Sequence, residues 1–286
     1  MRRAITLSAF GVGTTSPNPP VGCVVLDVHG RVVGEGYHQR KGEPHAEALA
    51  LAMAGGRAAG GTAVVTLEPC NHRGRTPPCR QALLDAGVKR VVIAVIDPTS
   101  RGEGGAARLA AAGVSVELGV LADEAMLVSG PWLAALGTGR PHVIWAYEAG
   151  PDGPSPVADD VVAATGLRDR VDAVLGEDGS VEEATPGAHG PDVFGVALPP
   201  VEDAAGVLSS LYAGGIRLLL VNGPSQGGRF ASAGEVDELR VFVSRPLTAH
   251  LVRTDSMLLP AGFRLSRVER QHDLVVLVAS PSEPDR

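Results

Sequence analysis

Three potential metal ligands and one carboxylate lie close together in the first third of the chain. His45 is followed two positions later by Glu47, and two cysteines come next in the segment Pro69-Cys-Asn-His-Arg-Gly-Arg-Thr-Pro-Pro-Cys79. One histidine and two cysteines can supply three tetrahedral zinc ligands and leave a fourth position open, which is typical of catalytic zinc. We therefore predict that His45, Cys70 and Cys79 bind Zn²⁺.

Glu47 is expected to transfer protons rather than to bind the metal. It stands at the start of a predicted helix, two residues from His45, where its carboxylate can reach a water on the metal. Zinc lowers the pKa of bound water toward about 7, and a neighbouring carboxylate can shuttle its proton. A His-x-Glu followed by Pro-Cys and a second Cys is the pattern of zinc deaminases, so Glu47 is the predicted general acid and base.

A closed, structural zinc site is the alternative interpretation. It would need a fourth protein ligand, for which His72 and His38 are candidates and Cys23 is a weaker one. Cys23 lies in the apolar run 21–26, which is typical of a small buried residue. A closed site would make the chain a non-catalytic scaffold that releases no ammonia.

The first half alternates strands with helices. Two apolar runs around a turn predict a hairpin, and later runs predict further strands and helices. The predicted strands are 21–26, 32–37, 62–67, 88–96 and 114–118, and the predicted helices are 2–13, 46–59, 81–86, 106–112 and 122–136. This order implies an α/β sheet covered on both faces. The punctuation Gly137-Thr-Gly-Arg-Pro141 places the domain boundary between residues 139 and 140.

The second half, 140–286, gives a weaker pattern. We predict strands at 142–147, 216–221, 239–243 and 274–279, a helix followed by a strand within 159–175, and a helix at 201–213. The acidic stretch 176–200 is interpreted as a loop. Residues 223–228 are interpreted as a glycine loop before a short helix.

Composition excludes several classes of protein. The 286 residues suggest two domains at about 150 residues each. No apolar run approaches the roughly 20 residues of a membrane span, and the first residues lack the apolar core of a signal peptide. Three cysteines are too few for a disulfide framework, which favours the cytoplasm. No basic run indicates nucleic acid as a partner.

The first half resembles a known family, the bifunctional deaminase/reductase of riboflavin biosynthesis. Matching segments are Thr15-Ser-Pro-Asn-Pro-Pro-Val-Gly22, Gly36-Tyr-His-Gln-Arg-Lys-Gly42, Pro44-His-Ala-Glu47 and Thr66-Leu-Glu-Pro-Cys-Asn-His-Arg-Gly-Arg-Thr-Pro-Pro-Cys79. The resemblance implies a cytidine-deaminase-like three-layer α/β/α domain followed by a truncated dihydrofolate-reductase-like α/β domain. The implied substrate is 2,5-diamino-6-(5-phosphoribosylamino)pyrimidin-4-one, hydrolysed at its 2-amino group to the 5-aminouracil.

The resemblance also implies substrate-binding roles. Asn18 would hydrogen-bond the ring or sugar of the substrate, although a turn residue between two prolines is the alternative. His38 and His72 would line the pocket. Arg75, with Thr76 beside it, lies between the two cysteines, where a guanidinium could hold the 5-phosphate. For the histidines and Arg75 the alternative is a solvated surface side chain.

The reductase half departs from the family pattern at its functional positions. Ala146 stands where the family has a lysine, and Asn222-Gly-Pro224 replaces the usual Glu-Gly-Gly. The segment between Gly176 and Val201 is shorter than the family's. Residues 140–286 have a net charge of −9, against +2 for residues 1–139, and contain no lysine. A dinucleotide phosphate needs cationic partners, so we expect an inactive reductase half without NADPH, although Gly227-Gly-Arg229 could still approach a phosphate.

Four functional hypotheses follow. The first is a zinc deaminase with a degenerate reductase domain, which the resemblance implies to be a homodimer and which needs a separate reductase for the next step. The second is a fully bifunctional enzyme that also uses NADPH. The third is a deaminase of a related pyrimidine in a specialised pathway. The last is the zinc scaffold without catalysis.

Overall fold

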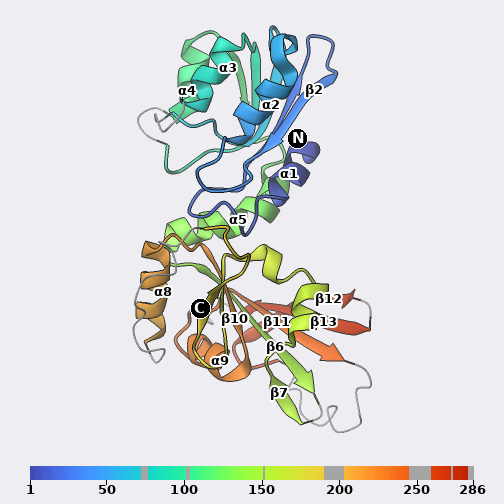
Figure 1. Cartoon of the computed structure of the whole chain (residues 1–286), viewed down its shortest axis with the longest axis vertical. Coiled ribbons are helices and arrows are strands. Elements are labelled where there is room, and N and C mark those ends of the chain that lie inside the picture. The colour runs from blue at the N-terminus through green and yellow to red at the C-terminus, as the bar shows by residue number, and fades with distance from the viewer. Residues whose placement is uncertain are drawn as a thin grey trace. The chain divides into compact units, whose positions relative to one another are not determined.

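The computed structural model describes residues 1–71, 77–100, 104–150, 152–189, 203–244, 259–271 and 273–282, and the chain divides into two compact units, Met1–Leu133 and Ala134–Arg286 (Figure 1). The division falls inside helix α5 (Ala122–Thr138), a few residues before the predicted domain boundary. The boundary between residues 139 and 140 therefore stays a prediction. No helix among the described residues is both long and apolar enough to cross a membrane.

The first unit is a three-layer α/β/α sandwich. Its five strands follow the order β2-β1-β3-β4-β5, antiparallel at β2-β1-β3 and parallel at β3-β4-β5. They are β1 (Gly22–Leu26), β2 (Val32–Tyr37), β3 (Thr62–Leu67), β4 (Arg90–Val95) and β5 (Ser115–Leu118). The remaining elements of this unit are α1 (Arg2–Ala9), α2 (Ala46–Ala54), the 3₁₀ turn Gly55–Ala58, α3 (Cys79–Asp85) and α4 (Gly104–Ala111). One apolar cluster joins α2, α3 and α4 to one face of the sheet, and another joins α1 to the opposite face.

Two glycines of β2 set the position of α2. A Cβ added to Gly34 would lie 2.0 Å from the carbonyl oxygen of Ala50, and one added to Gly36 would lie 2.5 Å from that of Ala46. Side chains at these two positions would therefore push the helix away from the sheet. Because His45 caps α2 and Glu47 lies in its first turn, this close approach fixes where both functional groups stand.

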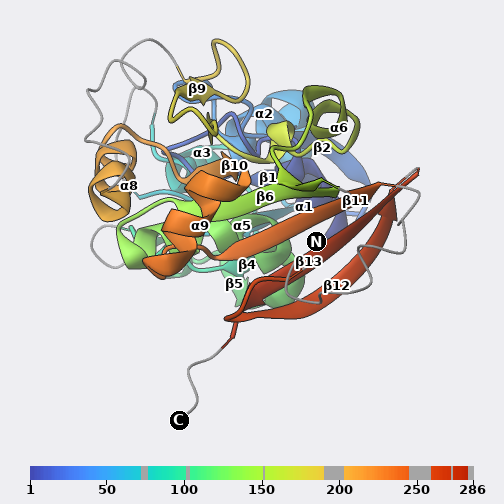
Figure 2. The ribbon, with the colours of Figure 1, turned by 90° about the horizontal axis from the view of Figure 1, so that it is seen from below.

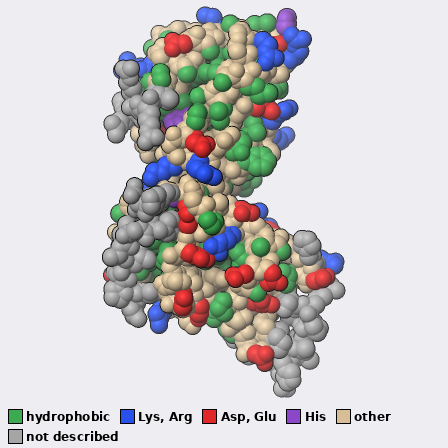
Figure 3. Space-filling view, in the orientation of Figure 1, with side chains coloured by type: hydrophobic (Ala, Val, Ile, Leu, Met, Phe, Trp, Pro, Cys, Tyr) green, Lys and Arg blue, Asp and Glu red, His purple; other side chains and the backbone are tan. Residues whose placement is uncertain are grey.

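The second unit contains an eight-stranded mixed sheet. Its order is β12-β13-β11-β6-β10-β8-β9, with β7 paired to β6, and its four central strands β11, β6, β10 and β8 are parallel (Figure 2). The strands are β6 (His142–Gly150), β7 (Gly153–Ser155), β8 (Ala173–Leu175), β9 (Val181–Glu183), β10 (Leu218–Asn222), β11 (Glu238–Ser244), β12 (Phe263–Gln271) and β13 (Leu274–Pro281). The helices are α6 (Asp159–Ala164), the 3₁₀ turn Arg168–Arg170, α8 (Ala204–Ala213) and α9 (Pro224–Ser232). Acidic side chains are spread over the face of this unit that Figure 3 presents, as its net charge predicts.

Two predictions for this unit are wrong. The stretch interpreted as a loop contains strand β9, which pairs with β8 as a hairpin. The segment interpreted as a glycine loop is helix α9, which begins at Pro224 and includes Gly227 and Gly228. Proline is favoured at the first position of a helix because it has no N–H to leave unpaired. Gly227 is required by packing, since a Cβ there would lie 1.8 Å from the indole nitrogen of Trp145.

A buried histidine joins two carboxylates at the start of β8. The His189 Nε2 lies 3.2 Å from Asp172 Oδ1 and its Nδ1 lies 3.1 Å from Glu183 Oε1, and its side chain has no exposed surface. Asp172 also accepts hydrogen bonds from the backbone N–H groups of Arg217 and Leu218, which lead into β10. Burial opposes the charged imidazole, but the two carboxylates outweigh it and raise the pKa of His189.

We predict that this network makes the second unit less stable at alkaline pH. Because the folded-state pKa of His189 is raised, its stabilisation is complete below the unfolded pKa of about 6.5 and is lost as pH rises through the folded pKa. His142 in the same unit has a pKa lowered by burial and acts in the opposite sense. A comparison of the parent with His189→Gln therefore isolates the contribution of His189 to the pH dependence of stability.

The chain has two tryptophans, so a Trp132→Phe background leaves Trp145 as the reporter of the second unit. Urea midpoints should fall more steeply between about pH 6 and about pH 9 with His189 present than with Gln. Parallel pH profiles for the two proteins would contradict a charged His189.

Candidate zinc site

The three predicted zinc ligands meet at one point of the first unit. The Nδ1 of His45 lies 3.2 Å from the Sγ of Cys79 and 3.7 Å from the Sγ of Cys70. All three ligand atoms lie within 4.8 Å of one another. His45 is positioned by the start of α2, Cys70 by the segment after β3, and Cys79 by the first turn of α3. Side chains 34 residues apart are thus brought together by two helix starts.

The spacing of these atoms fits a zinc ion. Zinc–sulfur bonds of about 2.3 Å and zinc–nitrogen bonds of about 2.0 Å at a tetrahedral angle separate N from S by about 3.5 Å. The two separations observed bracket that value. Among the described residues, the group has these three members and Glu47 is not one of them. One nitrogen and two sulfur donors at this spacing form a set that suits zinc.

The surroundings of the Cys70 sulfur favour its negatively charged form. The backbone N–H of Cys79 donates to the Sγ of Cys70 at 3.2 Å. The hydrogen bond with Cys79, together with His45, lowers the pKa of Cys70 to about 4. Cys70 and burial raise the pKa of Cys79. A cation bound between the two sulfurs would favour the thiolate form of both.

Glu47 is buried beside the metal ligands. Its side chain is almost fully enclosed, and it contacts the thiol of Cys79. Burial raises its pKa to about 6. A carboxyl group in this position can hold a proton or release it close to neutral pH, which is what a general acid and base needs.

His38 and Asn18 form a hydrogen-bonded pair next to His45. The His38 Nδ1 lies 3.2 Å from the carbonyl oxygen of Pro44, and its Nε2 lies 3.2 Å from the amide nitrogen of Asn18. Burial lowers the pKa of His38, so a neutral ring that donates from Nδ1 and accepts at Nε2 satisfies both contacts. Its ring also meets that of His45 edge-on, with centroids 5.2 Å apart.

We predict that His38 acts by positioning His45 and Asn18. His38→Ala frees the Pro44 carbonyl, which directly precedes the zinc ligand, and removes the partner of the Asn18 amide. Loss of such a supporting contact typically costs about 10–100-fold in activity or metal affinity. Ammonia release and zinc content should be measured together. The exposed His29, in the turn between β1 and β2, provides the control, since His29→Ala should change neither quantity. An unchanged His38→Ala protein would contradict the positioning role.

The remaining substrate-binding predictions are not placed by the structure. His72, Arg75 and Thr76 lie outside the described residues, so their roles stay predictions. Cys23, the weak candidate for a fourth ligand, is fully buried in β1, and burial raises the pKa of its thiol. It belongs to the apolar core of this unit.

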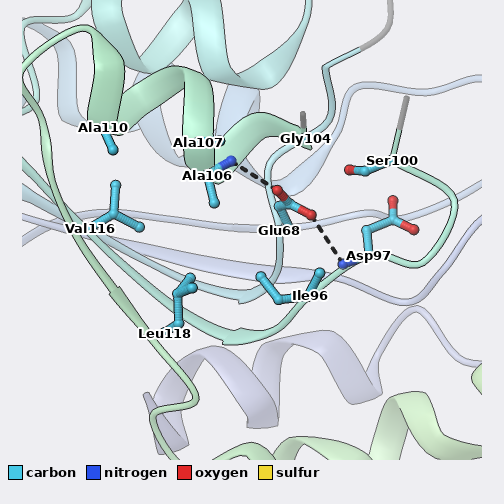
Figure 4. Close-up of a pocket in the computed structure, with 10 residues that line it drawn as sticks. All are labelled: Glu68, Ile96, Asp97, Ser100, Gly104, Ala106, Ala107, Ala110, Val116 and Leu118. Atoms are coloured by element: carbon cyan, nitrogen blue, oxygen red, sulfur yellow. Dashed lines mark hydrogen bonds between the residues drawn. The ribbon is translucent and has the colours of Figure 1, made fainter. Parts of the chain in front are cut away.

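Two residues that support the site were not recognised in the sequence. Glu68 is buried after β3, and its carboxylate accepts hydrogen bonds from the backbone N–H groups of Ala106 and Asp97. It therefore ties the start of α4 to the end of β4 (Figure 4). The indole of Trp132 donates to the carbonyl oxygen of Pro17 at 2.9 Å and so holds the segment that carries Asn18. A buried acid directly after an apolar strand was the available signal for Glu68.

Glu68 also borders a cavity of about 550 Å³ between α4 and the ends of β4 and β5. Figure 4 shows that small apolar side chains of α4 form much of its wall. None of the three metal ligands lines it. Because the carboxylate of Glu68 is occupied by two backbone donors, its part in the cavity wall is structural.

Comparisons with known proteins agree with this geometry. Residues 1–95 match the family model of the cytidine and deoxycytidylate deaminase zinc-binding region. The riboflavin biosynthesis protein RibD of Mycobacterium tuberculosis is 53% identical over 150 residues, which are 51% of this chain and 44% of that protein. The diaminohydroxyphosphoribosylamino-pyrimidine deaminase of Buchnera aphidicola (Schizaphis graminum) is 46% identical over 49% of this chain and 96% of that protein.

Solved structures match over nearly the whole chain. The diaminohydroxyphosphoribosylaminopyrimidine deaminase/5-amino-6-(5-phosphoribosylamino)uracil reductase of Thermotoga maritima has a TM-score of 0.79 at 26% identity, over 99% of this chain and 97% of that chain. RibD of Acinetobacter baumannii has a TM-score of 0.76 at 28% identity, over 99% and 98%. These matches confirm the predicted α/β fold, a cytidine-deaminase-like unit followed by a reductase-like unit. The shortened segment after Gly176 stays a prediction, since residues 190–202 lie outside the described part of the chain.

The sequence match to RibD of Mycobacterium tuberculosis covers less than half of that protein's length, and the same holds for RibD of Escherichia coli, at 43%. The Buchnera deaminase, in contrast, is matched almost from end to end. Both the local motifs and these matches lead to one assignment. The chain belongs to the deaminase/reductase family of riboflavin biosynthesis.

Proposed function

We propose that the first unit is a zinc-dependent deaminase of 2,5-diamino-6-(5-phosphoribosylamino)pyrimidin-4-one. Water replaces the 2-amino group, which leaves as ammonia, and the product is the 5-aminouracil. The observation that carries the proposal is the meeting of His45, Cys70 and Cys79 beside the buried carboxylate of Glu47. The names of the matched relatives support the choice of substrate.

The chain's own groups have distinct tasks in this proposal. His45, Cys70 and Cys79 hold the metal, and bound zinc supplies a Lewis acid that activates water. Glu47 takes up a proton and returns it to the departing nitrogen, which its burial beside the ligands favours. Asn18, held by His38, presents amide groups to the heterocycle. Arg75, Thr76 and His72 would contact the phosphoribosyl part and the ring.

The test is an ammonia-release assay on zinc-loaded protein. The phosphoribosylated diaminopyrimidine should yield one ammonia per substrate, and zinc analysis should give about one ion per chain. Related pyrimidines assayed in parallel test the specialised-pathway alternative. No ammonia from metal-replete protein with any of these substrates would overturn the deaminase and favour the zinc scaffold.

For the second unit we propose that reductase activity is lost. Ala146 at the expected lysine position is fully buried in the sheet, and this half contains no lysine. A fully bifunctional enzyme is the second candidate, because the solved deaminase/reductase of Thermotoga maritima matches along nearly its whole length. Addition of NADPH to the deaminated product separates the two. Its oxidation would establish the bifunctional enzyme, and its persistence would support the loss.

Three further proposals complete this picture. A separate reductase would process the deaminated product, the chain would act in the cytoplasm, and two copies would associate as a homodimer. Equilibrium sedimentation of the full chain tests the last of these, and a mass of one chain at micromolar concentration would contradict it.

A further inference from the structure

In the second unit, the carboxyl ends of the parallel strands are the place where a ligand is expected. In open α/β sheets, ligands bind in the crevice outside those ends, and a helix that starts there offers unpaired N–H groups to phosphate. β8 and β10 are neighbours in parallel register, so both end at the same edge. Helix α9 starts directly after β10, separated from it by Gly223. Its amino end is therefore where an anion is expected.

In this chain a carboxylate of the protein already occupies that position. Glu177 follows β8 by two residues, and its Oε1 accepts from the backbone N–H of Ser225 at 3.0 Å. Its Oε2 accepts from the N–H of Gln226 at 3.4 Å, and the side chain of Gln226 donates back to the Glu177 carbonyl oxygen. The first turn of α9 contains no acidic residue of its own. Glu177 thus supplies the negative charge that complements the helix dipole.

The carboxylate of Glu177 lies directly against the backbone of Gly223. A Cβ on Gly223, whose φ is 133°, would lie 2.2 Å from the Oε2 of Glu177. The indole of Trp145 donates to the carbonyl oxygen of Gly223 at 2.9 Å and packs against Gly227. The glycines at positions 223 and 227 leave room for the side chains of Glu177 and Trp145, respectively.

The polar groups next to Glu177, at the end of β10, also have partners within this unit. The side chain of Asn222, the last residue of β10, accepts from the backbone N–H of Val157 at 2.8 Å and donates to the Val157 carbonyl oxygen at 3.0 Å. The backbone N–H of Gly223 donates to the carbonyl oxygen of Ala146. Groups at the end of β10 are therefore committed to other parts of this unit.

We propose that Glu177 is an internal anion that fills the amino end of α9 and excludes phosphate-bearing ligands from it. This inference deepens the proposed loss of reductase activity, on which it rests, and gives that loss a specific structural basis. A phosphate would have to displace the carboxylate from two N–H donors and would meet its negative charge at close range.

The test replaces Glu177 and offers inorganic pyrophosphate to the full chain. Glu177→Ser vacates the two N–H donors, and Glu182→Gln is the matched control, because it removes one charge from an exposed side chain of the same hairpin. Trp145 fluorescence in the Trp132→Phe background reports thermal unfolding of the second unit. Glu177→Ser should unfold at a lower temperature than its parent, and pyrophosphate should raise its midpoint in a saturable, salt-sensitive manner.

The expected binding of pyrophosphate to Glu177→Ser is at least about tenfold tighter than to the parent or to Glu182→Gln. Equal binding by all three proteins, or no response of Glu177→Ser, would overturn the role of Glu177. If Glu177→Ser does not fold, Glu177→Gln keeps the shape without the charge and should show the same order of affinities, and equal affinities would again overturn it. NADPH oxidation by the protein with Trp132 intact would instead overturn the lost reductase activity. Ammonia release, also measured with Trp132 in place because its indole holds the Pro17 segment of the first unit, should be the same with and without the Glu177 and Glu182 substitutions.

Discussion

Glu47→Gln should abolish most ammonia release while zinc stays bound. The amide keeps the size and burial of the side chain but cannot take up or return a proton. General acid–base groups contribute about 10²–10⁴-fold to rate, so kcat should fall within that range. The measurement is ammonia release at saturating substrate, with zinc content determined on the same sample. Because Glu47 is not a member of the ligand group, the zinc content should equal that of the parent.

Glu117→Gln is the matched control for this experiment. Glu117 is a half-exposed residue of β5 that pairs with Arg90 on the sheet edge. The Glu117→Gln substitution removes the same charge from the same unit and should leave kcat unchanged. Full activity of a zinc-replete Glu47→Gln protein would exclude Glu47 as the proton carrier. Loss of zinc from that variant would instead indicate that the carboxylate supports the metal directly.

The metal site could be predicted from the sequence because its information is chemical and local. Histidine and cysteine are the ligands that zinc prefers, and a Glu two residues from the histidine shares its helix turn. The strand bounds of β2 and β3 were also predictable, since each is a short apolar run next to glycine. In both strands the apolar residues of the sequence largely agree with the burial that the structure shows.

The second unit shows where local patterns fail. Gly227 and Gly228 indicated a loop, yet both lie inside helix α9. Position 227 of this helix is a glycine because the indole of Trp145 leaves no room for a Cβ. β12 was missed because it is an edge strand exposed along most of its length, with three arginines and no regular apolar alternation. Edge strands often carry charge, which prevents pairing with other chains and also hides them from hydrophobic patterns.

Supporting residues were missed for a different reason. Glu68, Trp132 and Glu177 each bind backbone groups rather than side chains. Backbone partners have no residue type, so no motif records them, and they become visible only when the fold brings the segments together. The functional assignment of the first unit therefore depended on side-chain chemistry, while its precise support depended on tertiary structure.

Cys79→Ala should strip the first unit of its metal. The substitution removes one of the three ligand atoms that surround the site, from the first turn of α3. Loss of a mere supporting contact lowers metal affinity about 10–100-fold, so loss of a ligand should exceed about 100-fold. Zinc content after dialysis against a competing chelator should fall from about one ion per chain toward zero, and ammonia release should fall with it.

Cys23→Ala is the control that separates ligation from a general effect of cysteine loss. Of the three free cysteines, Cys23 lies in the core of β1 and outside the ligand group. Its replacement by alanine should leave zinc content and ammonia release unchanged, with at most a small loss of packing. If Cys79→Ala retained zinc as firmly as Cys23→Ala does, another side chain would have to complete the coordination. That result would favour the closed site of a scaffold over a catalytic centre, because an enzyme of this chemistry needs its fourth position for the reactant.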